Sequence, residues 1–422
     1  MGGDGTEEVD TSFFDHPHPV LRRWREQGDG VHRVRLLGQA PLEGWVITGH
    51  AACKAALADP RLSKNAATEA FDRRGGADEG PGPGRALTAH MLNSDPPDHT
   101  RLRRLVRQAF TVRRVAALRP VIASHVERLL DGMDGLAGLD GPDGSNGPDG
   151  SDGCEVDLVA EFAVPLPLAV VFDLLGASDG AGEILAAWAA TLTGDEGDGE
   201  VSVGTAEALV GHIRALLRHK RTRPGDDLLS ELIAARDAGD RLTEQEITSM
   251  AFLLVAAGHQ TTANLIANGV YALLTHPDQL AALRADPSLT GALTEEVLRH
   301  ESPFSIATMR YATEPVTIGG TTIPAGDFVQ IAMLAANRDP ALFPDPDRFD
   351  LTRPAAGHLA FGHGIHHCLG APLARLQAEI AFTALLRRYP ALRLTPAART
   401  AEPRWRQNPR HRGLRALPVL LR

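Results

Sequence analysis

The chain has 422 residues, 43% hydrophobic and 23% charged, so it can bury a large core without disulfide or metal staples. Its formal net charge of -10 argues against nucleic acid as the main partner, because phosphate backbones attract basic surfaces. Three cysteines without a CxxC spacing give no disulfide framework, and no run of about 18 apolar residues is present, so we expect a cytoplasmic protein that does not span a membrane.

The first half of the chain mixes short strands, helices and two loops. Residues 1–12 are acidic and Gly-rich, lack the pattern of a signal peptide, and are expected to be flexible. Residues 31–48 hold two β-like segments that predict a small sheet, and helical patterns dominate after about residue 50. Residues 75–84 read as a Gly- and Pro-rich loop. Residues 131–153 are low in complexity and predict a surface loop inserted into one continuous domain, residues 13–422.

A long buried helix is predicted from Thr243 to about Leu274. Thr243 and Glu246 have the spacing of a capping box, and His276 followed by Pro ends the apolar stretch. The middle of this stretch is apolar nearly all round, which is typical of a helix buried in a core. Shorter elements follow: two strands around a Gly-Gly turn at 316–331, a helix at 369–388 and extended segments from 391.

The most specific feature is the segment FGHGIHHCLG at residues 361–370. Cys368 follows a Gly-rich loop and immediately precedes a predicted helix, where backbone N–H groups and the helix dipole stabilise a thiolate. Gly362, Gly364 and Gly370 let the backbone approach a flat cofactor and direct N–H groups toward sulfur. A thiolate ligand pushes electron density into haem iron and favours O–O cleavage.

Two other interpretations of this segment remain open. Zinc could be bound by three histidines and Cys368, namely His363, His366 and His367. Such tight spacing cannot easily wrap one tetrahedral ion, and no second ligand pair lies at a typical spacing. The remaining alternative is an inert, buried structural cysteine.

The segment resembles the cysteine-ligand loop of the cytochrome P-450 family, whose FGxGxHxCxG pattern is matched at Phe361, Gly362, Gly364, His366, Cys368 and Gly370. The resemblance covers roughly residues 12–422 and implies a single, mainly α, triangular domain with a small β-rich region. It implies haem b with Cys368 as the axial thiolate ligand. The overall pattern is most similar to bacterial members that tailor macrolides and other secondary metabolites.

Glu296 and Arg299 are spaced i, i+3 and therefore share one face of a helix. Most such pairs are solvated and stabilise a helix only slightly. Here the pair resembles the family's ExxR helix. The run DPDRF at 345–349 resembles the segment that supplies a third, structural arginine, which makes Arg348 the candidate. The resemblance implies a buried salt-bridge network that holds the cysteine loop.

The segment AGHQTT at 257–262 lies in the predicted long helix. Gly258 is unfavourable inside a helix and, with Thr261, suggests a local opening; the alternative is that the threonines bond back to helix carbonyls. The segment resembles the family's oxygen-binding groove, where an acid–alcohol pair delivers protons. The acid position holds Gln260, which forms hydrogen bonds but carries no titrating proton. This departure puts ordinary, well-coupled hydroxylation in doubt.

The segment DPPDHTRLRR at 95–104 resembles the family's haem-propionate segment. The resemblance places His99 and Arg103 at the propionates, together with Arg310 and His366, through charge-assisted hydrogen bonds. Further arginines on this stretch could form a basic patch that docks an acidic ferredoxin: Arg101, Arg104, Arg107, Arg113 and Arg114.

Substrate contacts are carried over from the family by position alone. They are Leu87, Met91, Leu92, Phe252, Val255, Ala256, Phe304, Ile306 and Gln407. The chain has no dinucleotide or phosphate-loop motif, so electrons are expected from a separate ferredoxin and ferredoxin reductase. We expect a monomer that uses O2 to hydroxylate or epoxidise an apolar polyketide, macrolide or peptide.

Two alternative functions remain open beside hydroxylation or epoxidation. Gln260 motivates a haem-thiolate oxidase that catalyses oxidative coupling or desaturation. A non-catalytic haem-binding protein is the other. Product mass separates the first case from hydroxylation, and substrate-dependent consumption of reduced nicotinamide would rule out the second.

Overall fold

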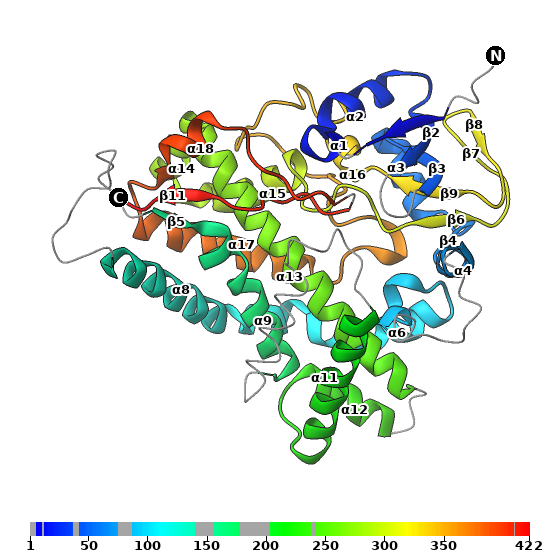
Figure 1. Ribbon diagram of the computed structural model, residues 1–422, viewed down its shortest axis with the longest axis horizontal. Coiled ribbons are helices and arrows are strands. Elements are labelled where there is room, and N and C mark those ends of the chain that lie inside the picture. The colour runs from blue at the N-terminus through cyan, green and yellow to red at the C-terminus, as the bar shows by residue number, and fades with distance from the viewer. Residues whose placement is uncertain are drawn as a thin grey trace.

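The computed structural model describes residues 6–10, 12–36, 42–74, 87–139, 155–177, 203–237, 242–408 and 410–422. Figure 1 shows a triangular, mainly helical molecule with a small β-rich region, which confirms the predicted fold class. The larger sheet lies at one corner, and α11 (Val203–Thr222) and α12 (Leu228–Asp237) form another. The long helix α13 (Glu244–Thr275) crosses the molecule between these parts.

The strands of the described residues form three sheets. The largest has the order β1 (Glu7–Val9), β2 (Val31–Leu36), β3 (Leu42–Ile47), β9 (Phe328–Ile331), β6 (Arg310–Ala312) and β4 (Leu62–Ser63). The others are β10 (Arg393–Leu394), β11 (Pro418–Leu420) and β5 (Glu155–Asp157), and the hairpin of β7 (Val316–Ile318) with β8 (Thr321–Ile323). The predicted sheet at 31–48 is therefore the β2–β3 pair, with Val34 opposite Gly44.

Helices make up the rest of the core. They are α1 (Ser12–Asp15), α2 (Pro17–Glu26), α3 (His50–Ala58), α4 (Asn65–Arg74), α6 (Asp98–Arg107), α7 (Val112–Ala117), α8 (Arg119–Leu139), α9 (Pro165–Leu175), α14 (Pro277–Ala285), α15 (Thr290–His300), α16 (Met333–Ala336), α17 (Ala371–Arg388) and α18 (Pro396–Thr400). Short 3-10 turns are η1 (Met91–Asn93), η2 (Gln108–Phe110), η4 (Pro287–Leu289) and η5 (Gly364–His366), and η3 (Val159–Ala163) is a π-helix. The largest apolar cluster joins α8, α9, α13, α15 and α17 around fully buried side chains such as Phe162 and Phe382.

The capping box predicted for the long helix is confirmed. The Glu246 N–H donates to Thr243 Oγ1 at 3.1 Å, and the Thr243 N–H donates to Glu246 Oε2 at 2.8 Å. Length and composition alone would let α13 cross a membrane, but 67% of its most apolar stretch is buried inside the protein. That burial is typical of the central helix of a globular fold.

Two expectations about flexible segments are wrong in part. Residues 7–9 form β1 at the edge of the large sheet, so the expected flexible N-terminus of residues 1–12 does not extend through this strand. Residues 131–139 continue α8, because Leu130 and Met133 lie one turn apart on its buried face. Gly132 faces open space, so glycine costs little packing there. Residues 140–153 of the predicted loop, and residues 75–84, lie outside the described residues.

The strand prediction at 316–331 gave two strands and the structure has three. β7 and β8 flank the Gly-Gly turn as expected, and β9 then joins the large sheet between β3 and β6.

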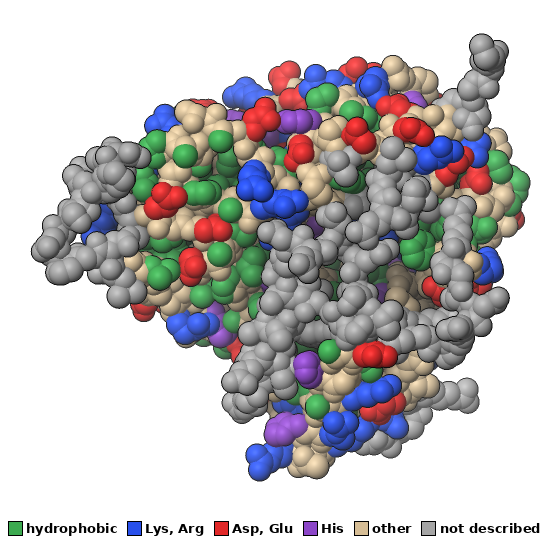
Figure 2. All heavy atoms as spheres, viewed as in Figure 1, with side chains coloured by type: hydrophobic (Ala, Val, Ile, Leu, Met, Phe, Trp, Pro, Cys, Tyr) green, Lys and Arg blue, Asp and Glu red, His purple; other side chains and the backbone are tan. Residues whose placement is uncertain are grey.

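Acidic and basic side chains are interspersed over the described part of the face in Figure 2.

Candidate haem-thiolate site

The cysteine loop joins η5 to α17 and is held by its own backbone. The Cys368 N–H donates to the Phe361 carbonyl at 2.8 Å, and the Gly362 N–H donates to Leu359 O at 2.8 Å. Gly364 has a φ of +74°, and a Cβ there would lie 3.2 Å from the backbone of α3, so this position requires glycine on both counts. The loop is thereby pressed against α3.

The groups around Cys368 act on the pKa of its thiol in opposite directions. Enclosure by protein raises the pKa of the thiol above its usual range. The N–H groups of Gly370 and Ala371, at the start of α17, and the guanidinium groups of Arg103 and Arg375 lower it. N–H groups at a helix N-terminus and nearby cations are the features that favour a thiolate. The net effect raises the pKa, and these N–H groups and arginines would stabilise a thiolate once a cationic metal is bound.

Arg375 is a residue that the sequence analysis missed. Its guanidinium donates to both carboxylate oxygens of Glu295, at 2.6 and 2.9 Å, and lies 4.6 Å from the ring centre of Phe361. His358 also contacts Glu295 at 3.2 Å, and these hydrogen bonds lower the pKa of Glu295 to about 2. Arg375 lies on α17, seven residues after Cys368. This spacing was the signal in the sequence that could have identified it.

The predicted propionate-binding residues converge beside this loop. The rings of His99 and His366 lie 4.4 Å apart, centre to centre. Both ring nitrogens of His99, Nε2 of His366 and Nε of Arg310 are buried without a well-formed hydrogen bond, although the Ile365 backbone approaches His99. Burial, followed by nearby cations, lowers the pKa of His366 to about 2.

This cluster fits a group that carries carboxylates. Buried donors without acceptors cost free energy that an anion would offset. Arg103 reaches the same region, since it donates to the His367 carbonyl at 2.6 Å. His99, Arg103, Arg310 and His366 would therefore hold the two propionates of a haem whose iron is bound by Cys368.

Lys64 joins this cluster and was also missed. It is 2% exposed, and its ammonium donates to Thr308 O at 2.9 Å and to the Thr308 hydroxyl. Burial and the positive charges of Arg310 and Arg410 hold the pKa of Lys64 well below its usual range. No motif surrounds Lys64 in the sequence, so only its position in the fold identifies it.

The Glu296–Arg299 pair is buried as predicted. Both side chains are 0% exposed, and the guanidinium donates to both carboxylate oxygens at 2.7 Å. Arg299 also donates to the carbonyls of Asn337, Pro346 and Arg348. The pair therefore fixes the segment that leads to the cysteine loop.

The third arginine of this network is Arg353, and the prediction of Arg348 is wrong for the side chain. The Arg348 side chain is 65% exposed and faces Asp350 at 3.6 Å, so only its carbonyl joins the network. The guanidinium of Arg353 lies 3.6 Å from Glu296 and donates to the carbonyls of Pro344 and Asp345. The backbone bends at Asp345, whose φ is 48°. After this bend, Arg348 contributes only its carbonyl to the network, and Arg353 contributes its side chain.

The predicted local opening at Gly258 is wrong. α13 is a continuous helix, and the Thr261 hydroxyl donates to the Ala257 carbonyl at 2.7 Å, which is the alternative that the sequence left open. Gly258 has another role, because a Cβ there would lie 2.9 Å from Cγ2 of Val171 in α9. Glycine at this position permits close packing of two helices.

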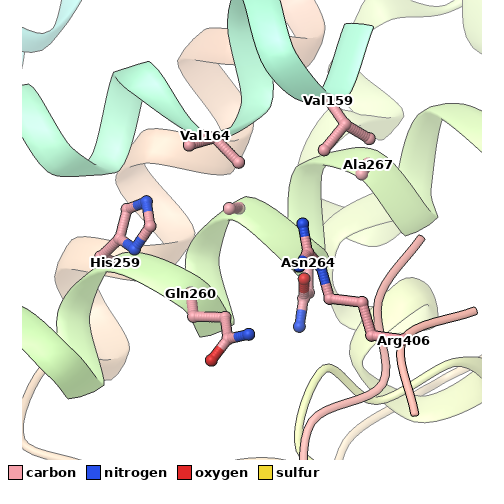
Figure 3. Close-up of a pocket in the computed structure, with 8 residues that line it drawn as sticks. Val159, Val164, His259, Gln260, Asn264, Ala267 and Arg406 are labelled. Carbon is pink, nitrogen blue, oxygen red and sulfur yellow. The ribbon is translucent and has the colours of Figure 1, made fainter. Parts of the chain in front are cut away.

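Gln260 borders a small pocket on the side of α13 that faces η3 and the C-terminal tail (Figure 3). His259 and Asn264 line it from α13, and Arg406 extends toward Asn264 from the tail. Both ring nitrogens of His259 and Nδ2 of Asn264 lack a well-formed hydrogen bond, and burial lowers the pKa of His259 to about 4. The pocket has room for about one water molecule, which these groups could bind.

The predicted substrate residues fall into several groups. Leu87, Met91 and Val255 are buried in one apolar cluster, with Leu92 and Phe252 packed against it. Ala256 is half-buried, Phe304 packs against a second cluster, and Ile306 is paired with Ala332 by a β-bridge. Gln407 is turned to Asp15, to which it donates at 2.9 Å; Arg406 is the tail residue that lines the pocket beside Gln260.

Known proteins resemble the chain over nearly its whole length. A model of the cytochrome P-450 family matches residues 203–399. The cytochrome P-450 monooxygenase PikC of Streptomyces venezuelae is 45% identical over 415 residues, 96% of this chain and 91% of that protein. The 6-deoxyerythronolide B hydroxylase of Saccharopolyspora erythraea is 42% identical over 401 residues, 93% of each chain.

A solved structure agrees with these relatives. The tirandamycin C-bound P-450 monooxygenase TamI is 42% identical, with a TM-score of 0.83, and the match covers 99% of this chain and 100% of that one. The matched length and the Cys368 loop beside a carboxylate-binding cluster lead to one assignment. The chain belongs to the cytochrome P-450 family and is a haem-thiolate monooxygenase.

Proposed function

We propose that the protein hydroxylates or epoxidises an apolar secondary-metabolite scaffold of the polyketide, macrolide or peptide class. The observation that carries this proposal is the convergence of Cys368 with the unpaired buried donors of His99, Arg310 and His366. The hydroxylase among the relatives supports the reaction type. Titration of the haem-loaded protein with such scaffolds should give type I spectral shifts, and the products should gain one oxygen atom; loss of two hydrogens would contradict the proposal.

Separate groups of residues would bind the haem iron, order water and exclude solvent in the proposed reaction. Bound haem supplies the reductive activation of dioxygen. Gly370 and Ala371 hold the thiolate of Cys368 through their N–H groups. Thr261 and Gln260 lie on adjacent positions of α13, where they would order the water and protons that the reaction consumes. The apolar cluster around Met91 and Val255 would exclude bulk water.

Gln260 supports a second candidate function, oxidative coupling or desaturation. The amide side chain cannot release a proton, so oxygen activation would depend on bound water and on the substrate. Gln260→Glu should shift the ratio of substrate product to hydrogen peroxide toward product, because a carboxyl group can relay protons. Gln260→Leu is the matched control and should shift the ratio the other way. The same ratio in all three proteins would place proton delivery elsewhere.

Electrons would come from a ferredoxin and its reductase, which dock beside the cysteine loop. Arg101 and Arg114 are already paired with Glu246 and Glu231. Arg107 at the end of α6 and Arg113 on α7 are exposed, and Val112, which precedes Arg113, is 79% exposed. Exposed arginines near an exposed apolar side chain suit an acidic partner.

A charge-reversal experiment tests this docking surface. Arg107→Glu with Arg113→Glu should raise the KM for ferredoxin several-fold and flatten its dependence on salt, because rim charges mainly steer association. The kcat at saturating ferredoxin should change little. An unchanged KM and salt dependence would remove this surface from the proposal.

We also propose that the protein is a cytoplasmic monomer.

A further inference from the structure

Arg375, on the second turn of α17, is held in a fixed position by an acid on another helix. Its Nε and Nη2 donate to Oε1 and Oε2 of Glu295 on α15, at 2.6 and 2.9 Å. Two such bonds fix the plane of the guanidinium as well as its place. The two side chains are 35% and 31% exposed, so the ion pair is partly enclosed by protein. It joins the helix that begins beside the cysteine ligand to the helix that carries Glu296 and Arg299.

His358 holds the same carboxylate from a second direction. Its side chain is 4% exposed, and its Nε2 lies 3.2 Å from Oε2 of Glu295. The Ala360 N–H donates to Nδ1 of His358 at 3.2 Å, so Nε2 carries the hydrogen that Glu295 accepts. Burial raises the pKa of Glu295, but the hydrogen bonds from Arg375 and His358 outweigh it and lower that pKa to about 2. The carboxylate is therefore ionised at neutral pH.

Phe361 places the guanidinium against the cysteine loop. The central carbon of the Arg375 guanidinium lies 4.6 Å from the centre of the Phe361 ring, within the range of a cation–π contact. The carbonyl of Phe361 accepts the N–H of Cys368 at 2.8 Å. One residue thus contacts the cation through its ring and the iron ligand through its backbone. In agreement with this geometry, the positive charge of Arg375 opposes the rise that burial causes in the pKa of the Cys368 thiol.

The fold of the cysteine loop does not require this ion pair. The loop is closed by its own backbone, through the N–H groups of Cys368 and Gly362, and it packs against α3 at Gly364. Neither contact involves Arg375. The other arginine that acts on the thiol, Arg103, is assigned to the haem propionates and donates to the His367 carbonyl. The pair of Arg375 with Glu295 is therefore a charged group beside the ligand that the site has not yet used.

Charges in this position act on the reduction of bound iron. When the ferric iron of the haem takes one electron from a reduced ferredoxin, it becomes ferrous, no bond is broken, and the centre gains one negative charge. A nearby cation stabilises that added charge and a nearby carboxylate opposes it. In the intact pair, the guanidinium and the carboxylate act in opposite directions, so removal of either one leaves the other unbalanced.

We propose that the ion pair of Arg375 with Glu295 sets the reduction potential of the thiolate-bound iron, and thereby how readily the enzyme accepts an electron from its redox partner. His358 fixes the carboxylate, and Phe361 fixes the guanidinium. These residues act through the iron ligand and not on the substrate. The inference holds for any scaffold that the enzyme oxidises.

Potentiometric titration of the haem-loaded protein, with dithionite and mediator dyes, tests the proposal. Arg375→Met leaves the carboxylate unbalanced and should lower the potential, whereas Glu295→Gln leaves the guanidinium unbalanced and should raise it. Each change should alter the reduction equilibrium by about threefold or more, and should shrink at high salt because the pair is partly exposed. The double variant should lie near the wild type.

Arg387→Met is the matched control. Arg387 lies in the last turn of the same helix, is 69% exposed and pairs with Glu127 at 2.6 Å. Its loss also leaves one carboxylate unpaired, but at the end of α17 remote from Cys368, so the potential should not change. The reduced carbon monoxide complex of all these variants should keep the red-shifted Soret band, because the loop is held by its own backbone.

Opposite shifts that cancel in the double variant would support the proposal. Shifts in the same direction would mean that both substitutions disturb the loop, and would overturn it. Unchanged potentials in both single variants, or loss of the red-shifted band in both, would also overturn it. If Arg375→Met does not retain haem, Glu295→Gln decides alone: a raised potential supports the proposal, and an unchanged or lowered one contradicts it.

Discussion

Cys368→Ser is expected to abolish the thiolate spectrum of the haem-loaded protein while leaving the fold intact. Serine has nearly the same shape, so the N–H groups of Gly370 and Ala371 keep an acceptor. The hydroxyl does not replace a thiolate as an electron-donating ligand, so the strongly red-shifted Soret band of the reduced carbon monoxide complex should disappear. Monooxygenase activity should fall to background. Absorption spectroscopy of reduced protein with carbon monoxide is the measurement.

Cys53→Ser is the matched control for that variant. Cys53 is fully buried, and its thiol donates to the Ile47 carbonyl at 3.2 Å. Burial raises its pKa, so it stays a neutral thiol far from ligand chemistry. This variant should keep the red-shifted band. A retained band in Cys368→Ser, or its loss in Cys53→Ser, would contradict the assignment of the iron ligand.

Arg299→Met should destabilise the protein more than any other single change in the charge network. The substitution leaves the Glu296 carboxylate buried at 0% exposure without its cation. Removing one partner of a buried pair costs about 3–5 kcal/mol, a large part of the stability of most domains. The free energy of unfolding of the haem-loaded protein, from denaturant titration followed by circular dichroism, is the measurement.

Three further variants separate this network from general effects of arginine loss. Arg299→Lys keeps the charge but loses the paired hydrogen bonds, and should lose less stability than Arg299→Met. Arg353→Met should have an intermediate effect, because its guanidinium lies 3.6 Å from Glu296. Arg348→Met should leave the unfolding curve unchanged, since its side chain is 65% exposed. A larger loss in Arg348→Met than in Arg353→Met would restore the original prediction.

Local patterns in the sequence predicted the parts of the site that depend on local geometry. The capping box at Thr243 and the pair of Glu296 with Arg299 each lie within one helical turn, so spacing alone defines which groups meet. The cysteine loop is equally local, because its glycines and the start of α17 direct N–H groups at one sulfur.

The errors arose where side-chain direction depends on distant packing. Arg348 and Arg353 are five residues apart in a loop, and spacing does not say which turns inward. Lys64 is brought to the propionate cluster by pairing of β4 with β6, which no motif records. The glycines after Leu130 suggested a loop, yet the apolar face of α8 outweighs their low helix propensity.

Packing between distant segments also explains why the predicted opening of the long helix is not observed. Gly258 is unfavourable in a helix taken alone, but α9 packs so closely there that a larger side chain would meet Val171.

The absorption spectrum of the reduced wild-type protein with carbon monoxide tests the central claim most directly. Thiolate ligation by Cys368 predicts a strongly red-shifted Soret band. A haem spectrum without that shift would mean ligation by a neutral thiol or a histidine, and would contradict the haem-thiolate mechanism even with the fold unchanged.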